Sequence, residues 1–400
     1  MWMQNLSYHA GATLLLFSLA RFWHTSAALA AATRPSAAGG SLLSGGLINL
    51  GNTCYLNSAL ECAFHIPRVR DLVISNTQCS DDADINAAGG GMDDTIALLS
   101  LREVFSSMKD SARKDVESSR PTSTSILCRN LGISAYEQQD SQEFWKLLLP
   151  ELNKPQLVDL YQGAYEGYIA ALDGSGRERK REEPFLDLSL DVSRGSIYTA
   201  LEEMFSKPEL LSEKEGNGWR PEKGADKVDA LKGSLLRVQG LPSLLQLHLM
   251  RFNYDWQTDT MSKINDRCKF PKVLDLSKIC TDAKEEEIPA TIYDLQSIVV
   301  HVGEYGSGHY YAYVRPDAKR NKWYRFDDHK VTEVDFKEVT ADSFGGYSER
   351  QRKNEKRGLL ARLFGSNIGF GWGGPKSSAY MLQYVRRCDV PKLYGKSSDG

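Results

Sequence analysis

The stretch GLINLGNTCYLNSALECAFHI, residues 46–66, places a thiol directly in front of an apolar helix pattern. Apolar residues recur there at the spacing of one helix face, and these are Leu56, Ala59, Leu60, Ala63 and Phe64. Cys54 is therefore predicted at the start of a helix. Unpaired backbone N–H groups and the positive end of the helix dipole stabilise an anion there, so Cys54 is a candidate nucleophile.

A second interpretation of this stretch is purely structural. Asn52 or Thr53 would cap the helix, and Cys54 would be a small buried apolar residue, which is the commoner fate of a cysteine. A nucleophile also needs a base, so the choice between the two interpretations depends on the rest of the chain.

Length and composition describe a globular chain. Its 400 residues suggest two or three units, and 41% hydrophobic residues suffice for a sizeable core. The net charge of −3 and the isoelectric point near 6.2 give no electrostatic argument for binding nucleic acid or an anionic membrane. We expect a monomer with neither of these partners.

Cysteine usage indicates a reducing compartment. The seven cysteines are odd in number, widely scattered and include no C-x-x-C pair. We therefore expect the cytoplasm, the nucleus or both, and neither a metal nor another cofactor.

The first 45 residues complicate this prediction of compartment. The apolar run GATLLLFSLA, followed by AALAAAT, resembles a secretory signal. However, the first nine residues contain no Lys or Arg, and Arg21, Trp23 and His24 interrupt the run. We favour an N-terminal extension over a working signal peptide.

Helical patterns dominate up to about residue 160, and strand patterns follow. An acidic, Gly-rich surface loop is predicted at 79–94, and a mobile basic and Gly-rich insert at 349–378. Alternation at period two begins in EEPFLDLSLDV, residues 182–192, and further strands are predicted at 243–252, 295–302, 309–315 and 321–326. Helices followed by strands indicate an α+β fold.

The candidate base lies in the last two of these strands. If they form a simple hairpin centred on Ala318, then Val314 faces Lys322 and His309 faces Asp327. Opposed Cβ atoms lie about 5 Å apart, so a carboxylate could orient the imidazole. A bulge would instead bring Asp328 to His309.

Residues around the candidate base complete a possible site. Gly306 and Gly308 allow a tight turn and leave room for a substrate backbone. His301 is the competing histidine, and we expect it to be structural or solvent-facing. Widely separated Cys, His and Asp residues fit a papain-like site, for which Asn49 is the candidate oxyanion donor.

Several segments resemble the ubiquitin-specific proteases in that family's order. Cys54 lies in a segment similar to the family's Cys box, and residues 301–315 together with 322–331 resemble its His box. QQDSQEFWKLLL (138–149), residues 241–271 and SAYMLQYVR (378–386) match further segments. The resemblance implies a papain-like core with a helical thumb, a β-sheet palm and β fingers.

The resemblance also implies roles for individual residues. By motif position, Cys54 matches the nucleophile, His309 the base, Asp327 the third triad member and Asn49 the oxyanion donor. The expected substrate-binding residues, which would hold the arginine-containing tail of ubiquitin, are Asp140, Glu143, Gly308 and Tyr310. Asp140 and Glu143 are also spaced as a helix capping box, which remains an alternative.

This chain departs from many relatives in its fingers. Those relatives bind zinc with two C-x-x-C pairs, whereas no cysteine lies between Cys128 and Cys268 here. We expect strand pairing and packing to hold the fingers together.

The sequence thus predicts a deubiquitinase that hydrolyses bonds after the C-terminal glycine of ubiquitin. The expected organisation is an extension at 1–45, a catalytic domain at 46–388, with its thumb at about 46–160, and a tail at 389–400. The alternatives are a protease for another ubiquitin-like modifier, a non-catalytic ubiquitin-binding module and a secreted papain-like peptidase.

Overall fold

The computed structural model describes residues 42–75, 94–112, 120–280, 282–306, 308–346 and 377–395. Three predictions fall mainly outside these ranges: the N-terminal extension, the acidic loop at 79–94 and the insert at 349–378. Within the described ranges, no helix is both long and apolar enough to cross a bilayer.

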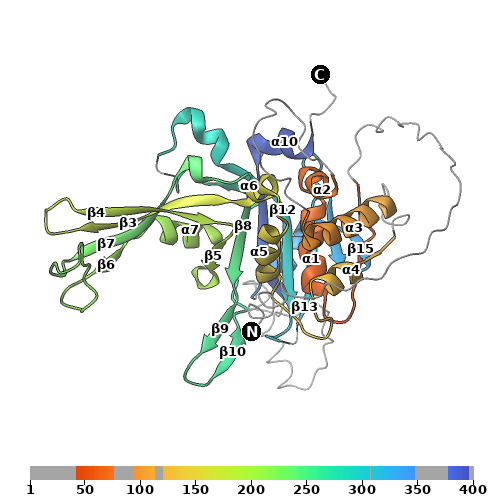
Figure 1. Cartoon of the computed structure of the whole chain (residues 1–400), viewed down its shortest axis with the longest axis horizontal. Coiled ribbons are helices and arrows are strands. Elements are labelled where there is room, and N and C mark those ends of the chain that lie inside the picture. Colours follow the sequence, from red (N-terminus) through yellow and green to blue (C-terminus); the bar gives the residue numbers. More distant parts are fainter. Residues whose placement is uncertain are drawn as a thin grey trace, which may run out of the picture. The chain divides into compact units, whose positions relative to one another are not determined.

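Six helices form the first part of the described chain (Figure 1). They are α1 (Cys54–Phe64), α2 (Pro67–Ile74), α3 (Ile96–Ser111), α4 (Ser125–Asn130), α5 (Ser141–Glu151) and α6 (Pro155–Tyr161). Every residue of α1 is buried, because this helix lies between α2, α5 and the strands of the central sheet. The helix predicted after Cys54 is confirmed.

The central sheet has eight strands and carries the second half of the candidate site. Seven follow the order β15-β14-β13-β12-β16-β8-β5, and β11 pairs with the first residues of β12. Their bounds are β5 (Leu188–Asp191), β8 (Leu244–Met250), β11 (Val273–Asp275), β12 (Ile292–Val302), β13 (His309–Val314), β14 (Trp323–Asp327), β15 (Lys330–Val334) and β16 (Ser377–Arg386). The strands predicted within 243–326 are all present.

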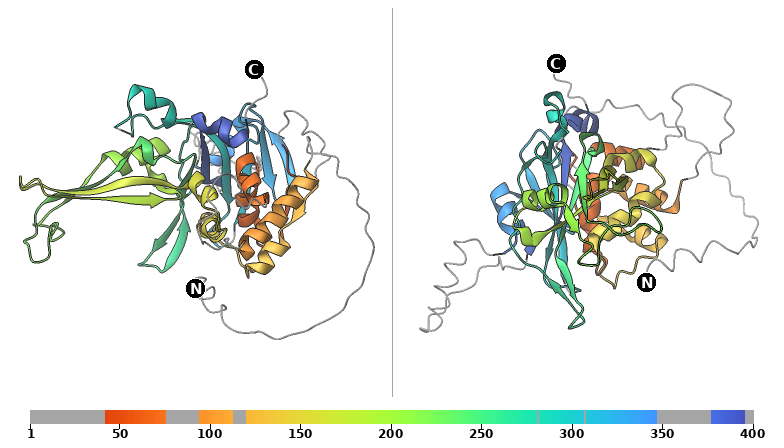
Figure 2. Two further views of the ribbon diagram at one scale, coloured as in Figure 1. Left: turned by 45° about the horizontal axis from the view of Figure 1, so that its top comes forward. Right: turned by 90° about the vertical axis from the view of Figure 1, so that its left-hand side faces the viewer.

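A four-stranded sheet projects away from the central sheet (Figure 2). Its order is β4-β3-β7-β6, with bounds β3 (Gly163–Ala171), β4 (Glu178–Phe185), β6 (Glu209–Leu211) and β7 (Ala230–Leu236). Helix α7 (Ile197–Ser206) packs against β7. The sequence reasoning missed the β3–β4 hairpin, because the edge strand β4 is almost entirely exposed and charged and shows no apolar alternation.

The remaining elements are short. A parallel pair joins β1 (Leu47–Ile48) to β2 (Thr122–Ser123), and β9 (Phe252–Asp255) forms a hairpin with β10 (Thr260–Lys263). Helix α8 is Phe336–Ser343, and α10 is Val390–Tyr394; the 3₁₀ turns are η2 (Val192–Arg194), η3 (Val238–Gly240), η4 (Glu285–Thr291) and η5 (Arg387–Asp389). The segregated helices and sheets confirm the α+β fold class, whereas the domain limits at 46–388 stay a prediction.

Candidate active site

Cys54 is the first residue of α1 and is only 3% exposed. The turn before it is organised by Asn49, whose Oδ1 accepts the backbone N–H of Gly51 at 2.9 Å and of Thr53 at 3.2 Å. Among the described residues, no side chain caps α1 at Thr53. The structural interpretation of Asn52 and Thr53 as helix caps was therefore wrong, and the N-terminus of α1 is left open beside the thiol.

His309 begins β13 and forms a close pair with Asp327 at the end of β14. Its Nε2 lies 2.6 Å from Oδ1 of Asp327. The hydrogen bond to Asp327 and a further one with the Cys54 thiol raise the pKa of His309 to about 10, although burial opposes the shift. The imidazole therefore joins the thiol to the carboxylate, as a nucleophilic site requires.

The register of the β13–β14 hairpin differs from the prediction. The ladder pairs Val314 with Tyr324 and Ala312 with Phe326, which centres the loop on Lys319 instead of Ala318. The predicted pairing of Val314 with Lys322 was wrong. His309 and Asp327 still meet, because they are diagonal neighbours on one face of the two strands.

Asp328 lies close to His309, but its side chain hydrogen-bonds to Asn49 and Asn57 and so joins the two halves of the site. Its Oδ2 accepts from Nδ2 of Asn49 at 2.9 Å, and its Oδ1 accepts from Nδ2 of Asn57 at 2.8 Å. Its backbone oxygen also accepts the N–H of Leu47. Asp328 therefore links β1 and α1 to the end of β14. The sequence reasoning missed Asn57, the residue of α1 that makes this contact. The oxyanion role of Asn49 stays a prediction.

Gln138 is a second residue that the sequence reasoning missed. Its Nε2 donates to the backbone oxygen of Gly308 at 2.6 Å and lies 3.6 Å from Sγ of Cys54. The N–H of Gly308 donates in return to Oε1 of Gln138 at 3.2 Å. The side-chain amide thus pairs with Gly308 as a neighbouring strand would, beside the thiol. Its only signal in the sequence is its place at the start of QQDSQEF.

The packing around Gly308 leaves no space for a side chain, whereas the predicted room for a substrate backbone stays a prediction. A Cβ at Gly308 would lie 1.9 Å from Nε2 of His301, whose ring is 1% exposed. The space therefore contains the His301 ring, which confirms His301 as a structural residue. Burial, with a smaller contribution from Lys263, lowers the pKa of His301 to about 3. Gly306 has φ +72°, as expected for a tight turn.

The other predicted substrate-binding residues differ in accessibility. Asp140 caps α5, because its Oδ1 accepts hydrogen bonds from the N–H groups of Gln142 and Glu143. Its other oxygen, Oδ2, accepts a hydrogen bond from the Tyr380 hydroxyl. Glu143 is exposed on the first turn of α5. Tyr310 is 3% exposed and packs between His301 and Tyr380. The capping role of Asp140 is confirmed, and binding of substrate by these residues stays a prediction.

Comparison with known proteins identifies the family. The sequence profile described as "Ubiquitin carboxyl-terminal hydrolase" matches residues 45–384. The chain belongs to the ubiquitin carboxyl-terminal hydrolase family. Among relatives, ubiquitin C-terminal hydrolase 13 of Arabidopsis thaliana is 32% identical over 370 residues, which cover 87% of this chain and 30% of that protein.

Two further relatives have the same family description in their names. Ubiquitin carboxyl-terminal hydrolase 15 of Schizosaccharomyces pombe is 31% identical over 86% of this chain and 28% of its own length. Ubiquitin carboxyl-terminal hydrolase 7 of Drosophila melanogaster is 27% identical over 88% of this chain and 28% of its own length. The chain thus spans about 30% of the length of these relatives.

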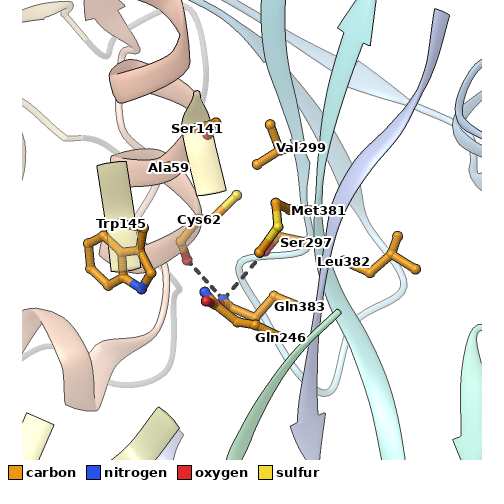
Figure 3. Close-up of a pocket in the computed structure, with 10 residues that line it drawn as sticks. All are labelled: Ala59, Cys62, Ser141, Trp145, Gln246, Ser297, Val299, Met381, Leu382 and Gln383. Atoms are coloured by element: carbon orange, nitrogen blue, oxygen red, sulfur yellow. Dashed lines mark hydrogen bonds between the residues drawn. The ribbon is translucent and has the colours of Figure 1, made fainter. Parts of the chain in front are cut away.

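A small cavity lies between α1, α5 and the central sheet (Figure 3). Its volume of about 20 Å³ holds no more than a water molecule. Gln383 crosses it, with Nε2 donating to the Cys62 backbone oxygen and to Oγ of Ser297. Burial raises the pKa of the Cys62 thiol to about 12, so Cys62 is a packing residue and not a second nucleophile.

The candidate active site around Cys54 and His309 contains the one group of potential metal ligands among the described residues. His309, Asp327 and Asp328 bring three such atoms within 4.8 Å of one another. However, both oxygens of each carboxylate already accept hydrogen bonds, from His309 and Arg325 at Asp327 and from two asparagines at Asp328. These contacts favour an organic catalytic site over a metal centre.

Proposed function

We propose that this chain is a thiol-dependent deubiquitinase that hydrolyses isopeptide or peptide bonds after the C-terminal glycine of ubiquitin. The observation that carries the proposal is the meeting of three groups. The thiol at the open N-terminus of α1 hydrogen-bonds to an imidazole that is itself held 2.6 Å from a carboxylate. Membership of the ubiquitin carboxyl-terminal hydrolase family supports ubiquitin as the substrate.

The proposed mechanism has two steps. The Cys54 proton passes to His309, and the thiolate attacks the carbonyl carbon of the terminal glycine. The tetrahedral oxyanion collapses to a thioester as His309 gives its proton to the departing amine. Water then loses a proton to His309 and attacks the thioester, which releases the ubiquitin carboxylate and restores the thiol.

Groups around the thiol support this chemistry. The N-terminus of α1 and the amide of Asn49 are the proposed donors to the oxyanion. Asp327 holds the imidazole in one tautomer. Its pKa lies below the ordinary value, because the hydrogen bond from His309 and the charge of Arg325 outweigh the opposing effect of burial. The carboxylate therefore stays ionised at neutral pH.

Substrate binding is proposed along the start of α5 and β13. Glu143 is exposed and offers a carboxylate to an arginine of the ubiquitin tail. Asp140, Gly308 and Tyr310 are the further proposed residues, although Asp140 and Tyr310 also have structural contacts. We also propose a monomer in the cytoplasm or nucleus, with no cofactor; the six cysteines within the described ranges are free thiols, as a reducing compartment favours.

An activity-based label tests the function and its alternatives together. Ubiquitin and other ubiquitin-like modifiers, each with a C-terminal electrophile, should be incubated with the wild type and with the Cys54→Ala and Cys62→Ala variants. We expect a covalent adduct with ubiquitin at Cys54, lost in Cys54→Ala and kept in Cys62→Ala. Mass spectrometry locates the adduct.

Other outcomes distinguish the alternatives. Preferential labelling by another modifier would assign the chain to that modifier. Binding of ubiquitin without labelling would indicate a non-catalytic binding module, and an adduct on Cys62 or Cys268 would reject the assignment of the nucleophile.

A further inference from the structure

Asp327 uses its two oxygens for two different partners. Oδ1 lies 2.6 Å from Nε2 of His309, and Oδ2 accepts from Nη2 of Arg325 at 2.8 Å. A carboxylate bonded through one oxygen can still rotate about its Cβ–Cγ bond. Because the second oxygen is also engaged, the carboxylate plane of Asp327 is fixed relative to the imidazole.

Arg325 is itself restrained from a different direction. Its guanidinium lies 4.0 Å from the centre of the Tyr311 ring, on the ring face. The hydroxyl of Tyr311 donates to Oδ2 of Asp342 on α8. Asp342 also accepts the hydroxyls of Tyr313, at 2.9 Å, and Ser377, at 2.7 Å.

These contacts form one continuous path to the triad. It runs from Asp342 through the Tyr311 hydroxyl and ring to the guanidinium of Arg325 and the carboxylate of Asp327. Tyr311 also packs beside His309, with ring centres 6.3 Å apart. The hydrogen bonds at Asp342 hold the Tyr311 ring, and the ring holds the guanidinium in the orientation that Asp327 needs.

We propose that Arg325 is a positioning residue for catalysis, which orients Asp327 and through it His309. This inference rests on the proposed deubiquitinase function. Arg325 is linked to the thiol through Asp327 and His309. Loss of its guanidinium would slow turnover because the imidazole would spend less time aligned with Cys54.

The charge of Arg325 also acts on Asp327 directly. The charged groups around the carboxylate are His309 from β13, Arg325 on the same strand, Lys330 paired with Asp327 from β15 and the adjacent Asp328. Asp342 faces Arg325 from α8. Arg325 and His309 both favour the ionised carboxylate. Removal of Arg325 should therefore let Asp327 take up a proton at a higher pH.

The test compares Arg325→Met, Arg325→Lys and Arg320→Met in the full chain, with cleavage of a fluorogenic ubiquitin C-terminal amide measured between pH 4 and pH 9. For Arg325→Met we expect a fall in kcat of roughly ten-fold with little change in KM, since orientation of a general base is impaired. The acid limb of kcat/KM should move upward by about one pH unit. Arg325→Lys should keep the acid limb near that of the wild type but recover kcat only in part.

Arg320→Met is the matched control. Arg320 lies in the exposed β13–β14 loop, where it contacts Asp317, so its kcat and pH profile should equal those of the wild type. Thermal unfolding and electrophile labelling at Cys54 verify that each variant is folded. If Arg325→Met does not fold, Arg325→Lys decides: a lowered kcat at unchanged KM supports positioning, and a wild-type kcat overturns it.

A folded Arg325→Met variant with a kcat within two-fold of the wild type and an unmoved acid limb would also overturn the proposal. A fall in Tm without a change in kcat or pH profile would assign Arg325 a structural role only. If the wild type neither cleaves nor labels with ubiquitin, the proposed function fails first, and that result is distinguishable from failure of the positioning role.

Discussion

The two adjacent aspartates at the end of β14 contact different parts of the candidate site. Asp327 hydrogen-bonds to His309, whereas Asp328, with φ +53°, accepts hydrogen bonds from Asn49 and Asn57. The positive φ bends the chain between them. This bend lets consecutive carboxylates contact His309 on one side and the segment around the thiol on the other.

Replacement of Asp327 by Ala should lower kcat at least roughly ten-fold with little effect on KM, because the imidazole loses the group that fixes its tautomer. Steady-state kinetics on a ubiquitin substrate measure both constants. Asp328→Ala should instead weaken the attachment of α1 and β1 to β14, which thermal unfolding would report. Near-normal kcat for Asp327→Ala would mean that another group orients His309.

A second prediction concerns a buried acid on the helix that carries the thiol. Glu61 is 1% exposed, and burial raises its pKa to about 8, although the hydrogen bond from Ser44 opposes the shift. In the folded state the Glu61 carboxyl therefore keeps a proton that it would release above pH 4.5, its ordinary pKa, in the unfolded chain. The stability from this proton is fully present below about pH 4.5 and is lost as the pH rises through about 8.

Glu61→Gln should remove this dependence. Across that pH interval, the free energy of unfolding of the wild type should fall relative to the variant with a slope approaching about 1.4 kcal/mol per pH unit. Denaturant titrations at several pH values measure the difference. Glu103→Gln, at an exposed position of α3, is the matched control and should run parallel to the wild type. A parallel curve for Glu61→Gln would show that Glu61 is ionised in the fold.

At the scale of elements, apolar periodicity identified α1 and the main strands because their side chains face the core. Register was not predictable in the same way. The contact between His309 and Asp327 was predicted from a ladder that pairs the wrong residues, and it survives because diagonal neighbours on one face can also touch. The strand β4 was missed because most of its side chains are exposed, so its sequence shows no alternation of apolar and polar residues.

Tertiary contacts account for the parts of the site that local patterns missed. Gln138 and Asn57 are polar residues whose partners lie 170 and 271 positions away in the chain. No spacing rule connects such positions. Likewise, the reason for a glycine at 308 is a histidine on the neighbouring strand β12, which becomes visible only once the strands are placed.

That packing gives a prediction for the β12–β13 pair. Gly308→Ala should be destabilising by about 1–3 kcal/mol, since the new methyl group overlaps the His301 ring and displaces the loop before His309. In a His301→Ala background the same substitution should cost less, because the ring is gone. Denaturant unfolding of the four proteins forms a double-mutant cycle, and equal costs in both backgrounds would show that the two positions do not interact.

At the scale of the whole molecule, the four-stranded sheet has no clustered thiols to hold a metal. Its strands are joined by continuous ladders, in which β3 pairs with β4 on one side and with β7 on the other. We predict that the purified protein contains no stoichiometric zinc and keeps its activity in chelator. Elemental analysis and an assay with and without chelator check this, and one tightly held zinc per chain would contradict it.

Because Gln138 is paired with Gly308, a substrate backbone that pairs with Gly308 would exchange its hydrogen bonds for those of the Gln138 amide. The N–H and C=O of Gly308 are already satisfied by the Gln138 amide, so an extended peptide that pairs with Gly308 must first displace it. The number of hydrogen bonds at Gly308 then stays the same, and they add little net binding energy. Affinity must come from contacts elsewhere on the substrate. A short peptide that offers only its backbone would gain almost nothing, whereas a folded protein that binds a distant surface could drive the exchange. If the chain is the proposed deubiquitinase, we therefore expect unfolded chains to be poor substrates.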